Sequence, residues 1–276
     1  MRNVVKLYIG CLLYTLLLLS SANALAVQPE VEIKVIRGVL SQKSSNDFFH
    51  SILLEALSYN TQGVNYKLKP VDFEFSQNRT LRLLNYDNVL DVTHSMTSAE
   101  REGKYIAIKV PLLSGLYGKR KLLVMAPNKA LFESMSVEQL KEQVACQGRH
   151  WPDFTRLEQN GFAVYGVNDY EANYKLLAKG RCTYFPRGIA EIQLDYDKYN
   201  GRYGELSIVN SVMLKYEAPI YFFVGKHQGE LAKTIEHGLK QMQETGKLKK
   251  ALSLSKAFHF DPSIESTKDL KVFQLN

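Results

Sequence analysis

Cysteine and tryptophan are scarce in this sequence, which has 3 Cys and 1 Trp among 276 residues. Cys11 lies in an N-terminal apolar run, which leaves Cys146 and Cys182 for the rest of the chain. Neither belongs to a cluster with metal-ligand spacing, so we expect no zinc site. In an exported protein the two could form one disulfide, and two isolated buried thiols are the alternative.

The sequence also lacks the common catalytic and cofactor motifs. It has no Gly-x-Ser-x-Gly, no His-Glu-x-x-His and no glycine-rich loop of the kind that cradles phosphate. A constellation such as Ser95 or Ser98 with His94 has nothing further to support it. We therefore predict that the protein is not an enzyme and requires no cofactor and no metal.

Only the N-terminus has a long apolar run. A basic start precedes Leu7–Leu19, and small residues follow at once. The run is shorter than the ~20 residues that a membrane-spanning helix needs. This pattern predicts a cleavable signal peptide over residues 1–24, with cleavage after Ala24 or Ala26. The mature protein would then be exported, with no membrane span.

The charge balance is mildly basic. The 35 Lys and Arg against 28 Asp and Glu give +7, and loss of the signal peptide leaves +5. The densest basic stretches, Lys119–Lys121 and Lys247–Lys250, are not interleaved with aromatic residues as nucleic-acid surfaces are. We therefore expect no nucleic-acid partner and favour a small anionic or zwitterionic ligand.

The pattern of apolar and polar residues predicts strands and helices that follow one another along the chain. The first half predicts strands at 31–36, 66–75 and 89–92 with helices at 47–58 and 80–84. The second half predicts strands at 121–126, 143–147, 162–167 and 181–185, extended chain at 206–211 and 215–224, and helices at 136–142, 152–161, 168–180, 188–192, 229–245 and 248–254.

This order predicts an α/β protein with two lobes, each built on a small mixed or parallel sheet. Residues 27–117 plus 217–276 would form lobe 1 and residues 118–216 lobe 2, joined by two crossover segments. Strand C-termini and helix N-termini would then face a cleft between the lobes, where ligands of open α/β sheets bind and where a hinge can close.

One loop carries the residue types of an anion site. Thr97, Ser98 and Arg101 follow an apolar strand, and arginine offers a planar fork of donors that grips a carboxylate. The alternative is a solvated loop in which Arg101 pairs with Glu100 or Glu102.

These residues carry a resemblance to the type II periplasmic binding proteins, solute-binding family 3. Leu90-Asp91-Val92 followed by Thr97 and Arg101 resembles that family's strand and its Thr-x-x-Arg loop, with a spacing here one residue longer. Gly148, before a helix, and Gly180–Thr183 resemble two further family positions, with Thr183 where the family has aspartate. The chain is most similar to a poorly characterised Gram-negative branch, through 96–102, 111–120, 148–153, 184–191 and 221–224.

The resemblance implies a monomeric periplasmic protein that closes on an amino acid or small carboxylate. It would serve an inner-membrane ABC importer or a signalling receptor. The alternative is a sensor or interaction module of the same fold without a transport role. The implied ligand contacts are Arg101, Thr97 and Ser98 from lobe 1 and Gly148, Trp151, Tyr184 and Arg187 from lobe 2. The fold also places the strands of Cys146 and Cys182 side by side, where a disulfide could form.

Overall fold

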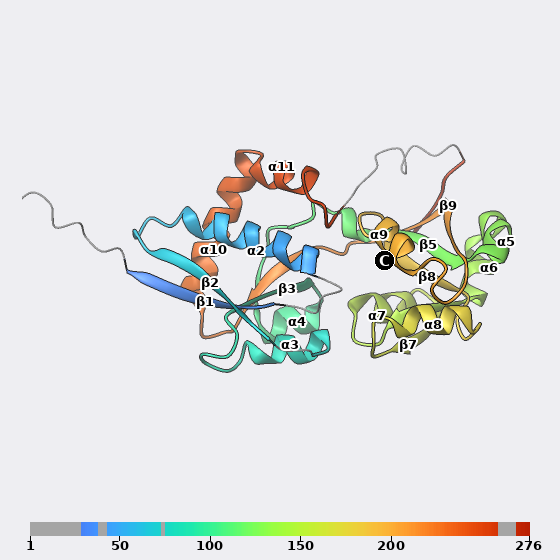
Figure 1. Ribbon diagram of the computed structural model, residues 1–276, viewed down its shortest axis with the longest axis horizontal. Coiled ribbons are helices and arrows are strands. Elements are labelled where there is room, and N and C mark those ends of the chain that lie inside the picture. Colours follow the sequence, from blue (N-terminus) through green and yellow to red (C-terminus); the bar gives the residue numbers. More distant parts are fainter. Residues whose placement is uncertain (1–28, 38–42, 73–74, 259–268) are drawn as a thin grey trace, which may run out of the picture.

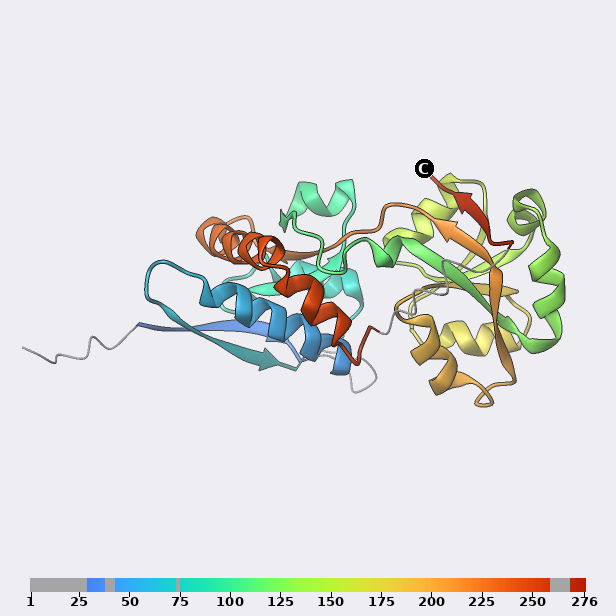
Figure 2. The same ribbon diagram turned by 90° about the horizontal axis from the view of Figure 1, so that it is seen from above.

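The computed structural model describes residues 29–37, 43–72, 75–258 and 269–276. Two lobes lie along the long axis of the molecule, each with its own sheet and covering helices (Figure 1). The view from above shows the segments that run between them (Figure 2). The predicted signal peptide lies outside the described residues. Within them, no helix combines the length and the apolar character needed to cross a bilayer.

Lobe 1 is built on a five-stranded mixed sheet in the order β2-β1-β3-β10-β4. β1 is parallel to β2 and β3, whereas β10 runs antiparallel to β3 and β4. Helices α2, α10 and α11 lie on one side of it and α3 and α4 on the other (Figure 1). The strands are β1 (Glu30–Ile36), β2 (Asn65–Val71), β3 (Val92–Met96), β4 (Ile106–Ile108) and β10 (Ile220–Val224), and the helices are α2 (Lys43–Ser58), α3 (Gln77–Leu83), α4 (Ala99–Lys104), α10 (Gly229–Glu244) and α11 (Lys247–Ser253).

Lobe 2 is built on a six-stranded mixed sheet in the order β11-β9-β5-β8-β6-β7. β5 runs antiparallel to both β8 and β9, and β6 is parallel to β7 and β8. The strands are β5 (Lys119–Met125), β6 (Val144–Gly148), β7 (Ala163–Val167), β8 (Tyr184–Gly188), β9 (Leu206–Lys215) and β11 (Lys271–Gln274), and the helices are α5 (Lys129–Ser134), α6 (Val137–Glu142), α7 (Pro152–Gln159), α8 (Ala172–Ala178) and α9 (Ile192–Tyr199).

Local sequence explains the elements that were predicted well. Ser136 and Gln139 form the predicted capping box at the start of α6. The apolar stripe of α10 is buried at Ala232, Ile235 and Leu239. Two strands lie later than predicted, because β3 runs through Met96 and β8 through Gly188. The helix predicted to end at Ile192 instead begins there.

The chain passes between the lobes a third time after α11; the two earlier crossing segments lie between β4 and β5 and between β9 and β10. They touch at Gly118 and Tyr216, where the Tyr216 amide donates to the Gly118 carbonyl at 2.9 Å. A Cβ on Gly118 would lie 1.9 Å from the Tyr216 carbonyl oxygen. Only glycine therefore allows the crossing segments to approach so closely.

The C-terminal strand belongs to the other lobe than predicted. β11 pairs in parallel with β9, with Val272 opposite Met213. Leu275 also donates its amide to the Lys215 carbonyl at 2.8 Å. The prediction assigned the whole of 217–276 to lobe 1. The chain instead returns to lobe 2 after α11, because β9 leaves an edge with which a short strand can pair.

Cys146 and Cys182 form a disulfide, with a Cα–Cα distance of 5.3 Å. Both residues are buried in lobe 2. The sequence left open a disulfide or two isolated buried thiols, and the disulfide is the one observed.

Candidate functional site

Two adjoining cavities lie between the lobes, with volumes of about 350 Å³ and 510 Å³. We call them cavity 1 and cavity 2. Residues of lobe 1, including Asn46, Gln77 and His94, line both, and so do Trp151 and Tyr170 of lobe 2. The cavities thus form one cleft that Trp151 and Tyr170 partly divide. Volumes of this order are typical of small-molecule sites.

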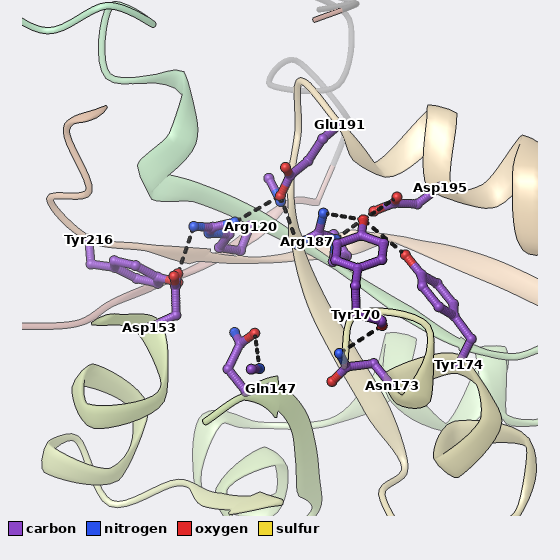
Figure 3. Close-up of polar contacts among 12 residues, drawn as sticks. Arg120, Gln147, Asp153, Tyr170, Asn173, Tyr174, Arg187, Glu191, Asp195 and Tyr216 are labelled. Atoms are coloured by element: carbon purple, nitrogen blue, oxygen red, sulfur yellow. Dashed lines mark hydrogen bonds and ion pairs between the residues drawn. The ribbon is translucent and has the colours of Figure 1, made fainter. Parts of the chain in front are cut away.

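The lobe 2 wall of cavity 1 is a network of buried charges (Figure 3). Arg120 on β5 pairs with Asp153 at 2.6 Å and Glu191 at 3.1 Å. Arg187 on β8 pairs with Glu191 at 3.1 Å and Asp195 at 2.5 Å. We call these five residues the charge network. Glu191 bridges the two arginines, so each guanidinium is held between two carboxylates.

Tyrosine hydroxyls complete this wall. Tyr170 donates to Asp195 at 2.6 Å and accepts from Arg187 at 2.7 Å, and Tyr216 donates to Asp153. Burial raises the pKa of both phenols well above the usual value. The hydroxyls therefore remain protonated and act as donors to the carboxylates.

Electrostatics keep the buried guanidiniums charged. Burial alone would lower the pKa of Arg187, but the carboxylates of Asp195 and Glu191 more than offset this, and the pKa is raised. Arg120 behaves in the same way, with Asp153 as its strongest partner. Arg120 Nε is buried and takes no acceptor among the described residues.

The lobe 1 wall is neutral and partly aromatic. His94 stacks on Phe49 with ring centroids 3.7 Å apart. Burial lowers the pKa of His94 to about 3, so its imidazole is neutral at physiological pH. Ser95, Met96 and Ile220 also line this side of cavity 1.

Arg101 is buried, and both of its terminal nitrogens donate to protein oxygens. Its Nη1 donates to Ser95 Oγ at 2.6 Å and to the Met96 carbonyl at 2.7 Å. Its Nη2 donates to Gln77 Oε1 at 2.7 Å, Asn78 Oδ1 at 3.0 Å and, across the cleft, the His150 carbonyl at 2.9 Å. Among the described residues no carboxylate forms a salt bridge with it, and it lines neither cavity. The sequence offered two interpretations of Arg101: a guanidinium free to bind an anion, or one paired with Glu100 or Glu102. Both differ from the contacts observed.

Three other predicted contacts also lie away from the cavities. Thr97 donates to Glu102 at 2.8 Å, and Ser98 caps α4 by accepting from the Arg101 amide at 3.3 Å. Tyr184 is fully buried in the lobe 2 core, beside Phe132. Thr97, Ser98 and Tyr184 line neither cavity, because local capping and core packing hold these side chains elsewhere.

The remaining predicted residues line the cleft. Arg187 lines cavity 1, Gly148 lines cavity 2 and Trp151 lines both. The Trp151 indole lies over Gly148, where a Cβ would come within 2.4 Å of the ring, and it stacks on Phe185. Trp151 thus both packs against its own lobe and faces the cleft. Ligand contact by these three residues stays a prediction.

Sequence reasoning missed most of the charge network. Arg120 was counted only as part of a basic stretch, yet Arg120 and Lys121 are buried. The available signal was their position in a strand that continues as Leu122–Val124, where charged side chains are rare unless paired. Asp153 and Asp195 had no comparable signal, since acidic residues in helices are usually solvated.

The described residues contain no group of three or more His, Cys, Asp or Glu side chains placed to hold a metal ion. The carboxylates of the charge network are instead paired with guanidiniums. The arrangement suits reversible binding of a small polar molecule between two walls of different polarity.

No protein-family model matches the sequence, and no curated protein matches it. Solved structures do match the fold. An ancestral arginine-binding protein bound to arginine has a TM-score of 0.58 and 16% identity, covering 83% of this chain and 99% of its own. The GluR0 ligand-binding core from Nostoc punctiforme, in complex with glutamate, has a TM-score of 0.54 and 20% identity, with 83% and 99% covered.

A histidine kinase sensor domain with similarity to periplasmic binding proteins has a TM-score of 0.60 and 13% identity, with 85% of this chain and 99% of that one covered. At such identities the likeness concerns the fold. It agrees with the two mixed sheets, the crossing segments and the cleft between the lobes. The chain therefore has the two-lobed fold of the type II periplasmic binding proteins.

Proposed function

We propose that this protein is a periplasmic solute-binding protein whose lobes close on a small zwitterionic molecule of the amino-acid class. The observation that carries the proposal is the charge network against the 350 Å³ cavity between the lobes. Groups of both signs are concentrated there, and buried charges are costly to maintain without a role or a partner. Two of the similar structures contain arginine or glutamate, which is consistent with this class of solute.

The proposed site lies on lobe 2 at Asp195, Glu191 and Arg187, with Trp151 covering one side and the neutral face of lobe 1 closing over it. The protein would deliver its solute to an inner-membrane permease, or its closed form would be recognised by a receptor. No covalent step and no cofactor enters this scheme.

Thermal denaturation of the purified protein with amino acids tests the proposal, after unfolding and refolding to remove any carried solute. At about 100 times the Kd, binding adds about 2.7 kcal/mol. For a chain of this size that corresponds to a rise in Tm of about 5–10 °C.

Asp195→Asn should abolish the shift, since it removes an anionic cleft group. Asp197→Asn is the matched control, because Asp197 lies on the same helix, is exposed and bonds only Gln193 among the described residues. If no amino acid raises the Tm, or if both variants respond like the parent, the proposal is wrong.

A sensor or interaction module is the second candidate. The contact that favours it is the bond from Arg101 to the His150 carbonyl, which joins the lobes with protein atoms alone. Such a protein would be closed without a solute and would present a fixed surface to a partner. Co-purification of a membrane protein with the solute-free chain, together with no thermal shift, would favour this candidate.

A further inference from the structure

Within the charge network, the groups that a solute in cavity 1 can reach most readily are carboxylates. The side chains of Glu191 and Asp195 are 13% and 10% exposed, whereas those of Arg187 and Arg120 are 4% and 1% exposed. The third carboxylate, on Asp153, is 5% exposed. A molecule that enters the cavity therefore meets anionic oxygens before it meets guanidinium nitrogens.

Most guanidinium nitrogens of the arginines between the lobes already have an oxygen partner in the protein. Each nitrogen of the Arg187 guanidinium bonds Glu191, Asp195 or Tyr170. Arg120 donates from both terminal nitrogens to carboxylates, and its remaining nitrogen, Nε, is buried. Arg101 donates to five neutral protein oxygens. A solute carboxylate would therefore have to share these nitrogens with the protein's own oxygens.

The charge count points the same way. Two arginines and three carboxylates give the charge network a formal charge of −1. The lobe 1 wall adds none, since His94 is neutral. Lys198 also lines cavity 1, but its side chain is exposed and lies over the Tyr199 ring at 5.1 Å, so solvent screens its charge.

Aromatic rings surround the same space. Those lining cavity 1 are Phe49, Tyr117, Trp151, Tyr170, Tyr199 and Phe258. Aromatic faces attract organic cations, and tryptophan and tyrosine do so most strongly. A cavity with accessible carboxylates and aromatic walls is suited to an ammonium or guanidinium group.

We propose that cavity 1 recognises a small organic cation, an amine or guanidine, and that the cationic group of the solute is required for binding while a carboxylate is not. This deepens the proposed function and rests on it. Glu191 and Asp195 contact the cationic group, and the aromatic residues enclose its apolar part. Arg187 positions the two carboxylates and does not itself grip the solute.

Matched pairs of probes separate the two ends of a zwitterion. Agmatine is arginine without its carboxylate, and cadaverine is lysine without its carboxylate, whereas glutarate is glutamate without its amine. Calorimetric titration of the refolded protein with all six is the experiment. We expect agmatine or cadaverine to bind within about tenfold of its parent amino acid, and glutarate not to bind.

Glu191→Gln is the test variant, because Glu191 is the most exposed carboxylate of the charge network. Loss of one accessible charge should weaken cation binding at least tenfold. Glu158→Gln is the control, since Glu158 is exposed on α7 away from the cavities and should leave affinity unchanged. Circular dichroism confirms that both variants are folded.

Binding of glutamate and glutarate, with no binding of agmatine and cadaverine, would overturn this inference and leave the proposed function intact. Equal affinity of Glu191→Gln and the parent for the cation would also overturn it. Failure of all six probes to bind would count against both the inference and the proposed function.

Discussion

The guanidinium of Arg101, in lobe 1, donates to the backbone carbonyl of His150, in lobe 2, across 2.9 Å of the cleft. Away from the crossing segments, no other side-chain hydrogen bond joins the lobes within the described part of the chain. Arg101 is 5% exposed, so water competes little for its donors. Burial lowers the pKa of this arginine to about 10, which leaves it charged at neutral pH. Gln77 and Asn78 present their amide oxygens where a carboxylate could otherwise bind.

Replacing Arg101 should open the protein in the absence of solute. A hydrogen bond to a charged group contributes about 1.5–3 kcal/mol, which corresponds to a roughly 10- to 150-fold change in the ratio of closed to open forms. We expect Arg101→Lys, which loses the planar fork, to increase the radius of gyration measured by small-angle X-ray scattering. Arg149→Lys is the control, because Arg149 is exposed and donates to Gly166 within its own lobe. An unchanged radius for Arg101→Lys would show that this contact does not hold the lobes together.

Gly148 sets the position of the only tryptophan. A Cβ there would lie 2.4 Å from Trp151 Cδ2, so Gly148→Ala should push the indole off lobe 2 and into the cleft. Intrinsic fluorescence should shift to longer wavelength as the ring gains contact with water. Gly229→Ala, where a Cβ meets no atom within 4 Å, should leave the emission unchanged. The same emission maximum in Gly148→Ala and the parent protein would contradict the packing described here.

The crossing segments should not tolerate a side chain at Gly118. Gly118→Ala brings a Cβ within 1.9 Å of the Tyr216 carbonyl oxygen, and overpacking of this kind costs about 1–3 kcal/mol. We expect a lower urea midpoint. Gly103→Ala, at an exposed helical position with free space, should instead be neutral or slightly stabilising. Equal midpoints for the two variants would argue against close contact of the crossing segments.

The disulfide should stabilise lobe 2. It closes a loop with a sequence separation of 36, for which the chain-entropy account gives about 3–4 kcal/mol. Cys146→Ser combined with Cys182→Ser should lower the Tm by roughly 6–15 °C. Calorimetry of the double variant and of the reduced parent checks this. A reducing agent that leaves the Tm unchanged would mean that the bond is absent or contributes little.

The elements with a clear apolar period could be predicted from the sequence, whereas the short strands at the edges of the sheets could not. α10 carries a clear apolar stripe and lies where expected, and α7 begins at Pro152, as predicted. β4, with three residues, and β11, with four, are too short to show a period of their own. β11 is a strand only because β9 offers it an edge. Such pairing depends on tertiary structure, which a linear pattern does not contain.

The site was predictable only in part for a related reason. Gly148, Trp151 and Arg187 follow the ends of the strands predicted at 143–147 and 181–185, and that position alone indicates a cleft. Arg101 was also expected there, but its side chain turns toward Gln77, distant in the sequence. The pairing of Arg120 with Asp153 and Glu191 likewise joins residues that no spacing rule connects. The sequence indicated the type of each residue and its position in a strand or helix. It did not indicate which side chain pairs with each charged group.

A fluorescence titration of Trp151 tests the central claim most directly, because this single tryptophan lines both cavities. Addition of a solute that calorimetry shows to bind should change the emission saturably, with one site and the calorimetric Kd, and Asp195→Asn should weaken both signals together. Binding heat without any change in Trp151 emission would place the solute outside the cleft and contradict the account.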